Sequence, residues 1–245
     1  MQIVITMAGE GSRFRDAGYT VPKYMVQVKG KTLFEWSLDS LTAFSAKITF
    51  VVRNGKNLQE LINFISEKCK ARKIDFAIDV VNELTKGQAE TAYIATSKLP
   101  ENETLLIYNI DTYVEPFSMK PEYIYGEGFI PCFKGEGDHW SFVKLAPKKG
   151  KSLFLGPAEE VREKVRISDY CSIGAYYFRS IKLYNDTYRK YYEDGDGDFE
   201  NKERYIAPMY NQMIKENLGV YIQDIPVEKV HVLGTPAEVK IFEEL

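Results

Sequence analysis

Short β-rich runs alternate with helical patterns along the first half of this 245-residue chain, and this alternation limits the folds open to it. The strand-like runs are 2–7, 48–52, 76–81 and 104–109, and the helical patterns between them are 32–44, 58–70 and 88–98. Alternation of this kind is typical of βαβ units on a parallel sheet. We therefore predict an α/β fold, with a Rossmann-like, mostly parallel sheet flanked by helices.

The second half has a different pattern, because turns and aromatic-rich β segments follow Glu115. The β segments are 129–133, 140–145 and 171–178, and helical patterns return at 205–216 and 237–244. Thr32 is a good N-cap for the helix 32–44 and Thr235 for the last helix, and Glu35 and Glu238, three residues on, predict a capping box at each start. We predict one domain over residues 1–245, with the β-rich part as a substrate-side insertion.

The charges and cysteines exclude several classes of protein. The chain has 32 basic and 35 acidic residues, a net charge of −3 and no basic stripe, so no nucleic-acid partner is expected. No apolar run approaches the ~20 residues that span a bilayer, so no membrane association is expected. Cys69, Cys132 and Cys171 lie far apart without a C-x-x-C pair, which favours neither a disulfide framework nor zinc. A cytoplasmic location fits these features best.

A glycine-rich loop follows the first strand-like run. Gly9 and Gly11 let backbone N–H groups approach a phosphate without intervening side chains. The dinucleotide-binding fingerprint would need a third glycine where Phe14 stands, and a helix opening at once rather than roughly twenty loop residues. The Gly-Lys-Ser/Thr of a P-loop is also missing. The loop therefore predicts phosphate binding of another kind.

Two cations accompany these glycines. Arg13 follows them directly, and Lys23 comes after Pro22, which stiffens the chain. Cations added to backbone donors suit a triphosphate, because negative charge develops on its oxygens when one phosphorus is attacked. The alternative interpretation is an ordinary surface loop with solvated charges.

Three stretches of this region, "MAGEGSRF", "PKYMVQVKGK" and "EWSLDSL", resemble the N-terminal signature of the sugar-1-phosphate nucleotidyltransferases. The match covers residues 1–44. In that family the glycine-rich loop and its Arg hold the triphosphate, and the Lys of the Pro-Lys pair lies beside the reacting phosphates. The resemblance implies nucleotide binding by Ala8, Gly9, Gly11 and Ser12, and catalytic roles for Arg13 and Lys23.

The segment "KGQAETAY" resembles the family's base-reading helix start, which implies that Gly87 and Gln88 contact the nucleotide base. Gln88 carries both a donor and an acceptor, as recognition of a base edge requires. The alternative is that Gln88 is only the first residue of an Ala-rich helix. Which base is read stays open.

Asp111 comes just after a predicted buried strand, where ligands collect in parallel sheets. The resemblance implies that it binds Mg²⁺, an ion usually held by one or two carboxylates and by substrate phosphates. The alternative is a turn or cap residue before Thr112. Several relatives carry a second acidic ligand near a C-terminal Gly-Thr-Pro, but Val232 stands there in "KVHVLGTPAEV". The second ligand is therefore unassigned.

The stretch "EVREKVRISDYCSIGAYYF" resembles the family's acceptor-binding segment. The resemblance implies that Glu163 contacts sugar hydroxyls, that Lys164 contacts the acceptor phosphate and that Gly174 belongs to the same site. A lysine suits this position, because it reduces the repulsion between two phosphate anions. Val165 replaces the family's usual proline, and a plain surface ion pair is the alternative.

The resemblance implies a nucleotidyltransferase in which residues 1–115 bind the nucleotide and residues 116–245 bind the acceptor. The expected partners are an NTP and a phosphorylated small molecule, most simply a sugar 1-phosphate. The products would be an NDP-sugar and pyrophosphate, with Mg²⁺ as cofactor and surface polysaccharide synthesis as the use. A homo-oligomer is compatible with this. The alternatives are a cytidylyltransferase acting on phosphocholine or a polyol phosphate, and a non-catalytic nucleotide-sensing module.

Overall fold

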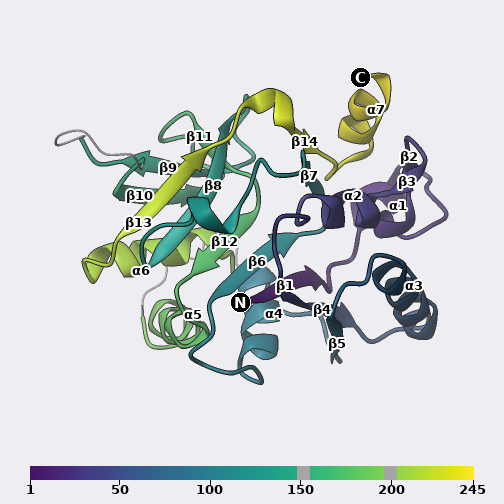
Figure 1. The fold of residues 1–245 in the computed structure, drawn as a ribbon, viewed down its shortest axis with the longest axis horizontal. Helices are drawn as coiled ribbons and strands as arrows, with labels where there is room; N and C mark the ends of the chain where they lie inside the picture. The colour runs from purple at the N-terminus through teal and green to yellow at the C-terminus, as the bar shows by residue number, and fades with distance from the viewer. Residues whose placement is uncertain (148–154, 196–202) are drawn as a thin grey trace.

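One large mixed sheet runs through the molecule (Figure 1). The structure, a computed structural model, describes residues 1–147, 155–195 and 203–245. In spatial order the strands are β10 (Ala158–Glu163), β9 (Ser141–Leu145), β11 (Tyr170–Ser172), β8 (Gly128–Lys134), β12 (Ala175–Phe178), β6 (Leu105–Asn109), β1 (Gln2–Met7), β4 (Lys47–Arg53) and β5 (Phe76–Val81), and β13 (Val220–Asp224) also pairs with β8. The predicted α/β class is confirmed.

The half of the sheet formed early in the chain is parallel. Strand β1 lies between β4 and β6, with Val4 opposite Thr49 on one side and Ile107 on the other. The chain therefore extends the sheet in one direction from β1 to β4 and β5, and later in the opposite direction with β6. In parallel sheets, ligands bind beside the carboxyl ends of the strands at such a reversal.

The later half is mainly antiparallel, and β12 joins it to the parallel half. Strand β12 pairs antiparallel with β6 on one side and with β8 on the other. Our prediction of one continuous strand over 171–178 is wrong, because the chain breaks after Ser172 into β11 and β12. Gly174 stands in the break with φ +80°, a left-handed conformation that interrupts a strand.

Helices cover both faces of the sheet, and alternate residues of each strand face them. Ile3 and Ile5 pack into a core cluster with helices α2 and α3, whereas Val4 packs into the cluster on the other face. The first face is covered by α2 (Leu33–Asp39) and α3 (Leu58–Ala71), and the second by α4 (Gln88–Thr96), α5 (Ile181–Tyr188) and α6 (Tyr210–Lys215). The result is three layers around two hydrophobic clusters.

Several predicted helices are shorter in the structure. Helix α2 begins at the predicted cap but ends at Asp39, and the predicted helix 205–216 is a 3₁₀ turn followed by α6. The short helical pieces are 3₁₀ turns at Lys23–Met25, Pro121–Tyr123, Ala207–Met209 and Val227–Lys229, and a π-helical turn at Arg189–Glu193. Helix ends fray easily because their last carbonyls lack partners within the helix.

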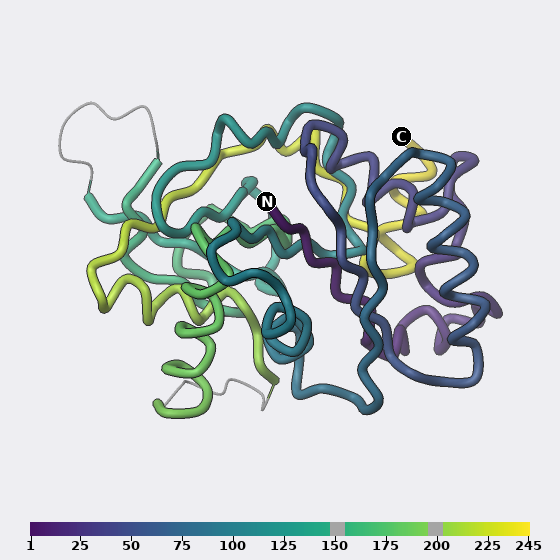
Figure 2. Tube along the Cα trace, turned by 60° about the horizontal axis from the view of Figure 1, so that its bottom comes forward, coloured from purple at the N-terminus to yellow at the C-terminus, as the bar shows by residue number. Residues whose placement is uncertain are grey.

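The first loop is more ordered than the sequence indicates. It contains helix α1 (Ser12–Asp16) and the small hairpin of β2 (Gln27–Val28) and β3 (Lys31–Thr32), where we predict only loop. The C-terminal helix α7 (Pro236–Glu244) packs on this region, as both ribbon and tube views show (Figures 1 and 2). A third cluster fixes the contact through Phe14, Val26, Val28, Leu33, Leu233, Val239 and Phe242.

Strand β14 (Val230–Val232) leads into α7 and pairs with β7 (Thr112–Val114), which directly follows β6. Only one of the two hydrogen bonds of the predicted capping box of α7 is present. Thr235 accepts a hydrogen bond from the backbone N–H of Glu238, but the Glu238 carboxylate does not return to the backbone of Thr235. The first loop and the C-terminal segment therefore meet beside the carboxyl end of β6.

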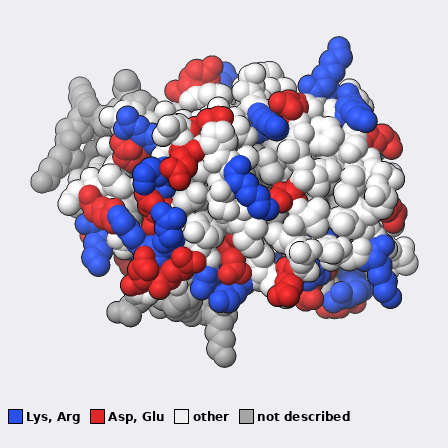
Figure 3. Space-filling model, turned by 90° about the horizontal axis from the view of Figure 1, so that it is seen from below, with Lys and Arg blue, Asp and Glu red and all other residues white. Residues whose placement is uncertain are grey.

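The surface and the cysteines are those of an ordinary globular domain. On the face seen in Figure 3, basic and acidic residues are interspersed. Within the described ranges, no helix combines the length and the apolar composition needed to cross a membrane. Cys69, Cys132 and Cys171 are all buried free thiols. Burial raises the pKa of Cys69 to about 12, so it stays protonated at neutral pH.

Candidate active site

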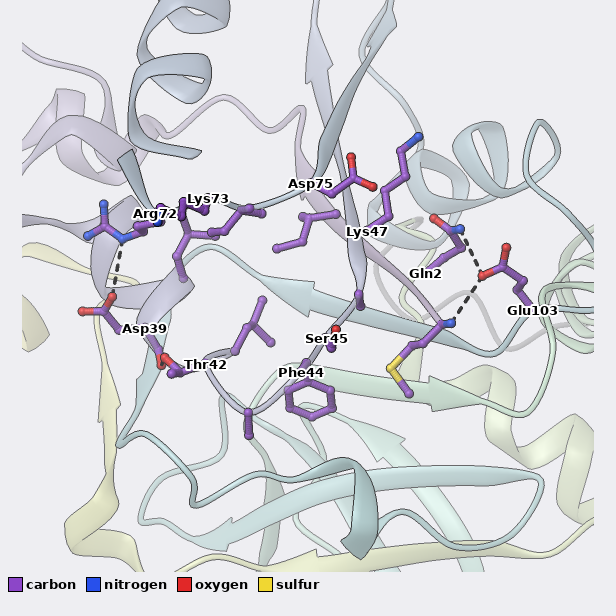
Figure 4. Close-up of a pocket in the computed structure, with 17 residues that line it drawn as sticks. Gln2, Asp39, Thr42, Phe44, Ser45, Lys47, Arg72, Lys73, Asp75 and Glu103 are labelled. Carbon is purple, nitrogen blue, oxygen red and sulfur yellow. Dashed lines mark hydrogen bonds and ion pairs between the residues drawn. The ribbon is translucent and has the colours of Figure 1, made fainter. Parts of the chain in front are cut away.

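Two hollows lie at opposite edges of the parallel strands. One, of about 950 Å³, lies at the amino ends of β1 and β4 (Figure 4). Four of its charged groups pair with one another, Arg72 with Asp39 at 3.6 Å and the N-terminal amine with Glu103 at 3.3 Å. None of the predicted site residues lines this hollow. The edge of the sheet where parallel strands bind ligands is the other one.

The second hollow, of about 540 Å³, lies at the carboxyl ends of β1 and β6. Gly9, Gly11, Lys23 and Asp111 line it together, although they come from segments far apart in the chain. The structure thus brings the predicted triphosphate loop and the predicted metal carboxylate into one place. This hollow is the smaller of the two, but it is the one lined by the predicted phosphate-binding and metal-binding residues.

The glycine-rich loop turns sharply at the base of this hollow. Gly11 has φ +60° and begins α1, of which Ser12 is the first residue. Ala8 is buried beneath the loop. A Cβ added at Gly9 would meet no atom of the described chain within 4 Å, so the missing side chain leaves open space. That space is what a phosphate needs to reach backbone N–H groups.

Lys23 and Asp111 form an ion pair on the wall of the hollow. The Lys23 Nζ lies 2.8 Å from the Asp111 Oδ2, and 16% of the lysine side chain and 33% of the aspartate side chain are exposed. The same ammonium lies 5.6 Å from the centre of the Phe14 ring. A cation therefore already neutralises the carboxylate that the resemblance assigns to Mg²⁺.

Gln88 is the first residue of α4, and its side chain points back to the sheet. Its Nε2 donates to Thr6 Oγ1 at 3.3 Å and to Asn109 Oδ1. These partners stand at the ends of β1 and β6. The side chain is thus fixed at the same sheet edge as the phosphate loop, which is more than an ordinary helix start provides. Its contact with a base stays a prediction.

Gly87 is covered by a segment that no pattern in the sequence predicts there. The Arg204 N–H donates to the Lys86 carbonyl at 2.7 Å, and the Arg204 carbonyl accepts from the Ala89 N–H at 2.9 Å. A Cβ at Gly87 would lie 2.6 Å from that carbonyl oxygen, and its φ is +142°. Glycine is therefore required here by the crossing segment. No local pattern could reveal a contact between residues more than a hundred positions apart.

The acceptor candidates lie next to this crossing. Glu163 is only 7% exposed and accepts a hydrogen bond from Ser141 Oγ, which rules out the solvated surface pair. Lys164 has φ +56°, and its Nζ lies 4.5 Å from the centre of the Tyr205 ring and bonds the Tyr205 hydroxyl. Tyr205 is thus a member of this group that sequence reasoning missed.

Electrostatics link the acceptor group to Arg13. Burial, the hydrogen bond to Glu203 and the charge of Glu163 raise the pKa of Tyr205, and the exposed Arg13 guanidinium lowers it in part. The Tyr205 hydroxyl therefore remains protonated at neutral pH. Arg13 itself does not line the hollow with Lys23, and this effect on the pKa of Tyr205 is its link to the acceptor candidates.

Gly174 completes the connection through Asn109. The Asn109 N–H donates to the Gly174 carbonyl at 3.1 Å, and a Cβ at Gly174 would overlap the Asn109 side-chain amide. Asn109 also receives the bond from Gln88. The predicted base-binding and acceptor-binding residues therefore meet at one asparagine at the end of β6.

The surroundings of Asp111 explain the departure noted at Val232. Val232 pairs with Thr112, is partly buried and packs against a hydrophobic cluster. The next residues, Leu233 and Gly234, lie against Asp111, and the Leu233 N–H donates to the Asp111 carbonyl at 2.8 Å. In the described part of the chain, no group of three or more His, Cys, Asp or Glu side chains could hold a metal ion. Any magnesium site here must therefore rest on fewer protein ligands.

Comparisons with solved structures give full-length matches, whereas no family model and no curated protein matches the sequence. A nucleoside-diphosphate-sugar pyrophosphorylase from Vibrio cholerae is 34% identical, with a TM-score of 0.87 over 99% of this chain and 100% of that one. An inositol-1-phosphate CTP transferase from T. maritima is 15% identical, with a TM-score of 0.75 over 99% of this chain and 93% of that one. A UDP-glucose pyrophosphorylase complexed with UDP-glucose is 14% identical, with a TM-score of 0.75 over 99% of this chain and 97% of that one. The last two show the shared fold alone.

Proposed function

Because this chain belongs to the family of nucleoside-diphosphate-sugar pyrophosphorylases, we propose that it condenses an NTP with a sugar 1-phosphate. The products are an NDP-sugar and pyrophosphate. The chain is thus a nucleotidyltransferase, and the proposal concerns its substrates and its residues. An activated sugar of this kind serves synthesis of surface polysaccharide, in the cytoplasm where NTPs are made.

The observation that carries the proposal is the ion pair of Lys23 and Asp111 in the hollow beside Gly9 and Gly11. A flexible cation, a carboxylate and an open stretch of backbone N–H groups are what a triphosphate with its metal ion requires. Ordinary surface loops have no reason to gather these three features at the carboxyl end of a parallel strand.

The residues fit a magnesium ion. Asp111 offers a hard oxygen ligand, and the Lys23 ammonium at 2.8 Å shows that a cation is already accommodated beside it. A bound Mg²⁺ would neutralise part of the negative charge of the phosphates. Asp111 would hold the ion, and Lys23 would then be released from its carboxylate to contact the phosphates.

The reaction needs little covalent help from the protein. An oxygen of the sugar 1-phosphate forms a bond to the α-phosphorus, and the bond from that phosphorus to the bridging oxygen of pyrophosphate breaks. No general base is required, because the attacking oxygen is already anionic. Arg13 and Lys23 stabilise the charge that develops on the phosphoryl oxygens, and Lys164 holds the acceptor phosphate.

The proposed acceptor-binding residues Glu163 and Lys164 are grouped with Tyr205. Glu163 is buried and ionisable, so its burial is tolerated only if it accepts hydrogen bonds from groups such as the Ser141 hydroxyl. Sugar hydroxyls supply further donors of the same kind. The Lys164 ammonium bonds the Tyr205 hydroxyl, whose pKa is raised by the charge of Glu163 and lowered in part by that of Arg13.

The test is pyrophosphate release from four NTPs crossed with sugar 1-phosphates, phosphocholine and polyol phosphates in the presence of Mg²⁺. We expect one NTP and one sugar 1-phosphate to react. Lys23→Ala and Asp111→Asn should each lower kcat/KM by at least about 100-fold, the loss typical for one group that stabilises transition-state charge. The exposed Lys56→Ala and Asp16→Asn are the matched controls and should react like wild type.

Release that depends on phosphocholine or a polyol phosphate would replace the sugar in the proposal by that acceptor. Turnover at the wild-type rate in both Lys23→Ala and Asp111→Asn would refute the assignment of the site. Nucleotide binding without release from any pair would instead identify a sensing module.

A further inference from the structure

Helix α7 places a second carboxylate beside Asp111. Glu238 lies in the first turn of this helix, where its N–H bonds the Thr235 hydroxyl at 3.3 Å. A Cβ added at Gly234 would lie 3.3 Å from Glu238 Oε2 and 3.6 Å from Asp111 Oδ2. The two carboxylates therefore face a common point beside Gly234.

The Glu238 carboxylate is poorly satisfied by the protein itself. Its Oε2 is buried and has no hydrogen-bond partner among the described residues. Its Oε1 lies 3.9 Å from His139 Nε2, and 23% of the side chain is exposed. A buried carboxylate oxygen without a donor is destabilising, and a cation at that oxygen removes the penalty.

The missing side chain at Gly234 explains why Glu238 can reach this point. Gly234 follows Leu233, whose N–H bonds the Asp111 carbonyl, so a side chain at 234 would project toward the Asp111 carboxylate. The backbone at Gly234 is not left-handed, so it does not itself demand glycine. Glu238, four residues on, places its oxygen in the space that a side chain at 234 would take.

We propose that Glu238 is the second carboxylate ligand of the divalent cation, together with Asp111. The proposal rests on the proposed function only for the presence of that cation. Mg²⁺ prefers oxygen ligands, and two carboxylates with substrate phosphates are its usual set in phosphoryl-transfer sites. The assignment also removes the difficulty at Val232, because the ligand comes from the helix after that strand.

A competing role for Glu238 is purely structural, as the partner of a protonated His139. In that case a shorter carboxylate at position 234 should not compensate for the loss of Glu238, because the nearest neighbours of a Cβ there are the Glu238 and Asp111 carboxylates and not His139. In a metal site it could, because the new carboxylate would start from the point that both Glu238 and Asp111 face. This difference decides the design of the experiment.

The test measures Mn²⁺ binding to the intact protein by the loss of the free-ion EPR signal, without any turnover. We expect wild type to bind the ion and Glu238→Gln to weaken the affinity at least about tenfold, the lower end of what losing even a supporting partner of a metal ligand costs. Glu244→Gln, exposed at the other end of α7, is the matched control and should bind like wild type. The double variant Gly234→Asp with Glu238→Gln should recover most of the affinity.

Two results would overturn the assignment. One is that Glu238→Gln binds Mn²⁺ with the same affinity as wild type, or that neither protein binds the ion. The other is that Glu238→Gln loses Mn²⁺ affinity and the added Gly234→Asp substitution does not restore it. Pyrophosphate release is measured in parallel to keep the two proposals apart. Normal Mn²⁺ behaviour and normal release in Glu238→Gln would refute the ligand but leave the proposed function. Mn²⁺ binding that follows the expected pattern without release from any substrate pair would refute the function but leave the ligand.

Discussion

At the scale of single residues, Asn109 organises the candidate site. Its Oδ1 accepts from Gln88, and its backbone N–H bonds the carbonyl of Gly174. The sequence marks Gln88 and Gly174 through the family resemblance, yet it gives no indication that they share a partner. Contacts among residues so far apart depend on the register of the whole sheet, which local patterns do not contain.

Substituting Gly174 tests this arrangement. In Gly174→Ala the new Cβ would meet the Asn109 amide in a backbone with φ +80°, so Asn109 must shift and Gln88 loses a partner. We expect a lower melting temperature and weaker binding of the preferred NTP. Gly18→Ala is the control, since Gly18 has φ +85° but nothing within 4 Å of its Cβ, and it should show only the strain of about 1–2 kcal/mol. Equal effects in both variants would mean that Asn109 carries no part of the site.

At the scale of elements, α2 shows what sequence patterns predict well. Thr32 accepts from the Glu35 N–H at 3.3 Å, and the Glu35 carboxylate accepts from the Thr32 N–H at 3.1 Å, so the predicted capping box is confirmed. Burial raises the pKa of Glu35, but the bonds from Thr32 and the charges of Lys68 and Arg72 outweigh it, and the net pKa is lowered.

Removing the cap should therefore be costly and dependent on pH. We expect Thr32→Ala to lower the free energy of unfolding by about 1 kcal/mol at pH 7, and Thr32→Ser, which keeps the hydroxyl, to lose much less. Because the pKa of Glu35 is lowered on folding, its contribution is present above its ordinary pKa of 4.5 and is lost as the pH falls through the folded value. The difference between the two variants in urea unfolding should shrink below pH 4.5; a constant difference would contradict this.

The elements that the sequence missed are those that other parts of the chain hold in place. The strands 2–7 and 76–81 are confirmed to the residue, because each is a mostly apolar, β-rich run with clear ends. Helix α1 and the hairpin β2–β3 are too short to be stable alone, and they are ordered by packing against α7. A pattern read over a short window cannot include a helix from the opposite end of the chain.

At the scale of the whole molecule, the two halves of the chain share one sheet and one core. Strand β12 hydrogen-bonds both β6 and β8, and the cluster under α4 and α5 draws residues from both halves. The gathering of Gly9, Gly11, Lys23 and Asp111 could be predicted, because carboxyl ends of parallel strands share an edge. The contributions of Arg204, Tyr205 and Glu238 could not be predicted. These residues belong to the later half of the chain and do not follow strands of the parallel sheet, so the rule for parallel strands does not place them.

This continuity predicts cooperative unfolding. Trp36 lies in α2 and Trp140 next to β9, so each half of the chain has one of the two tryptophans. We expect Trp36→Phe and Trp140→Phe to show one shared midpoint when urea unfolding is followed by the remaining tryptophan and by circular dichroism, after correction for any overall shift in stability. Separate midpoints for the two probes would mean that residues 1–115 and 116–245 unfold as independent units.

The crossing of Arg204 over Gly87 also bears on how the protein is made. The main-chain groups of Lys86 and Ala89 leave the ribosome well before Arg204, the residue that bonds both of them. Because a domain folds as a unit, the helix start at Gly87 lacks its cover until Arg204 has also left the ribosome. The place we assign to the nucleotide base is therefore finished late, and a nascent chain gains its full hold on a nucleotide only when translation is nearly complete.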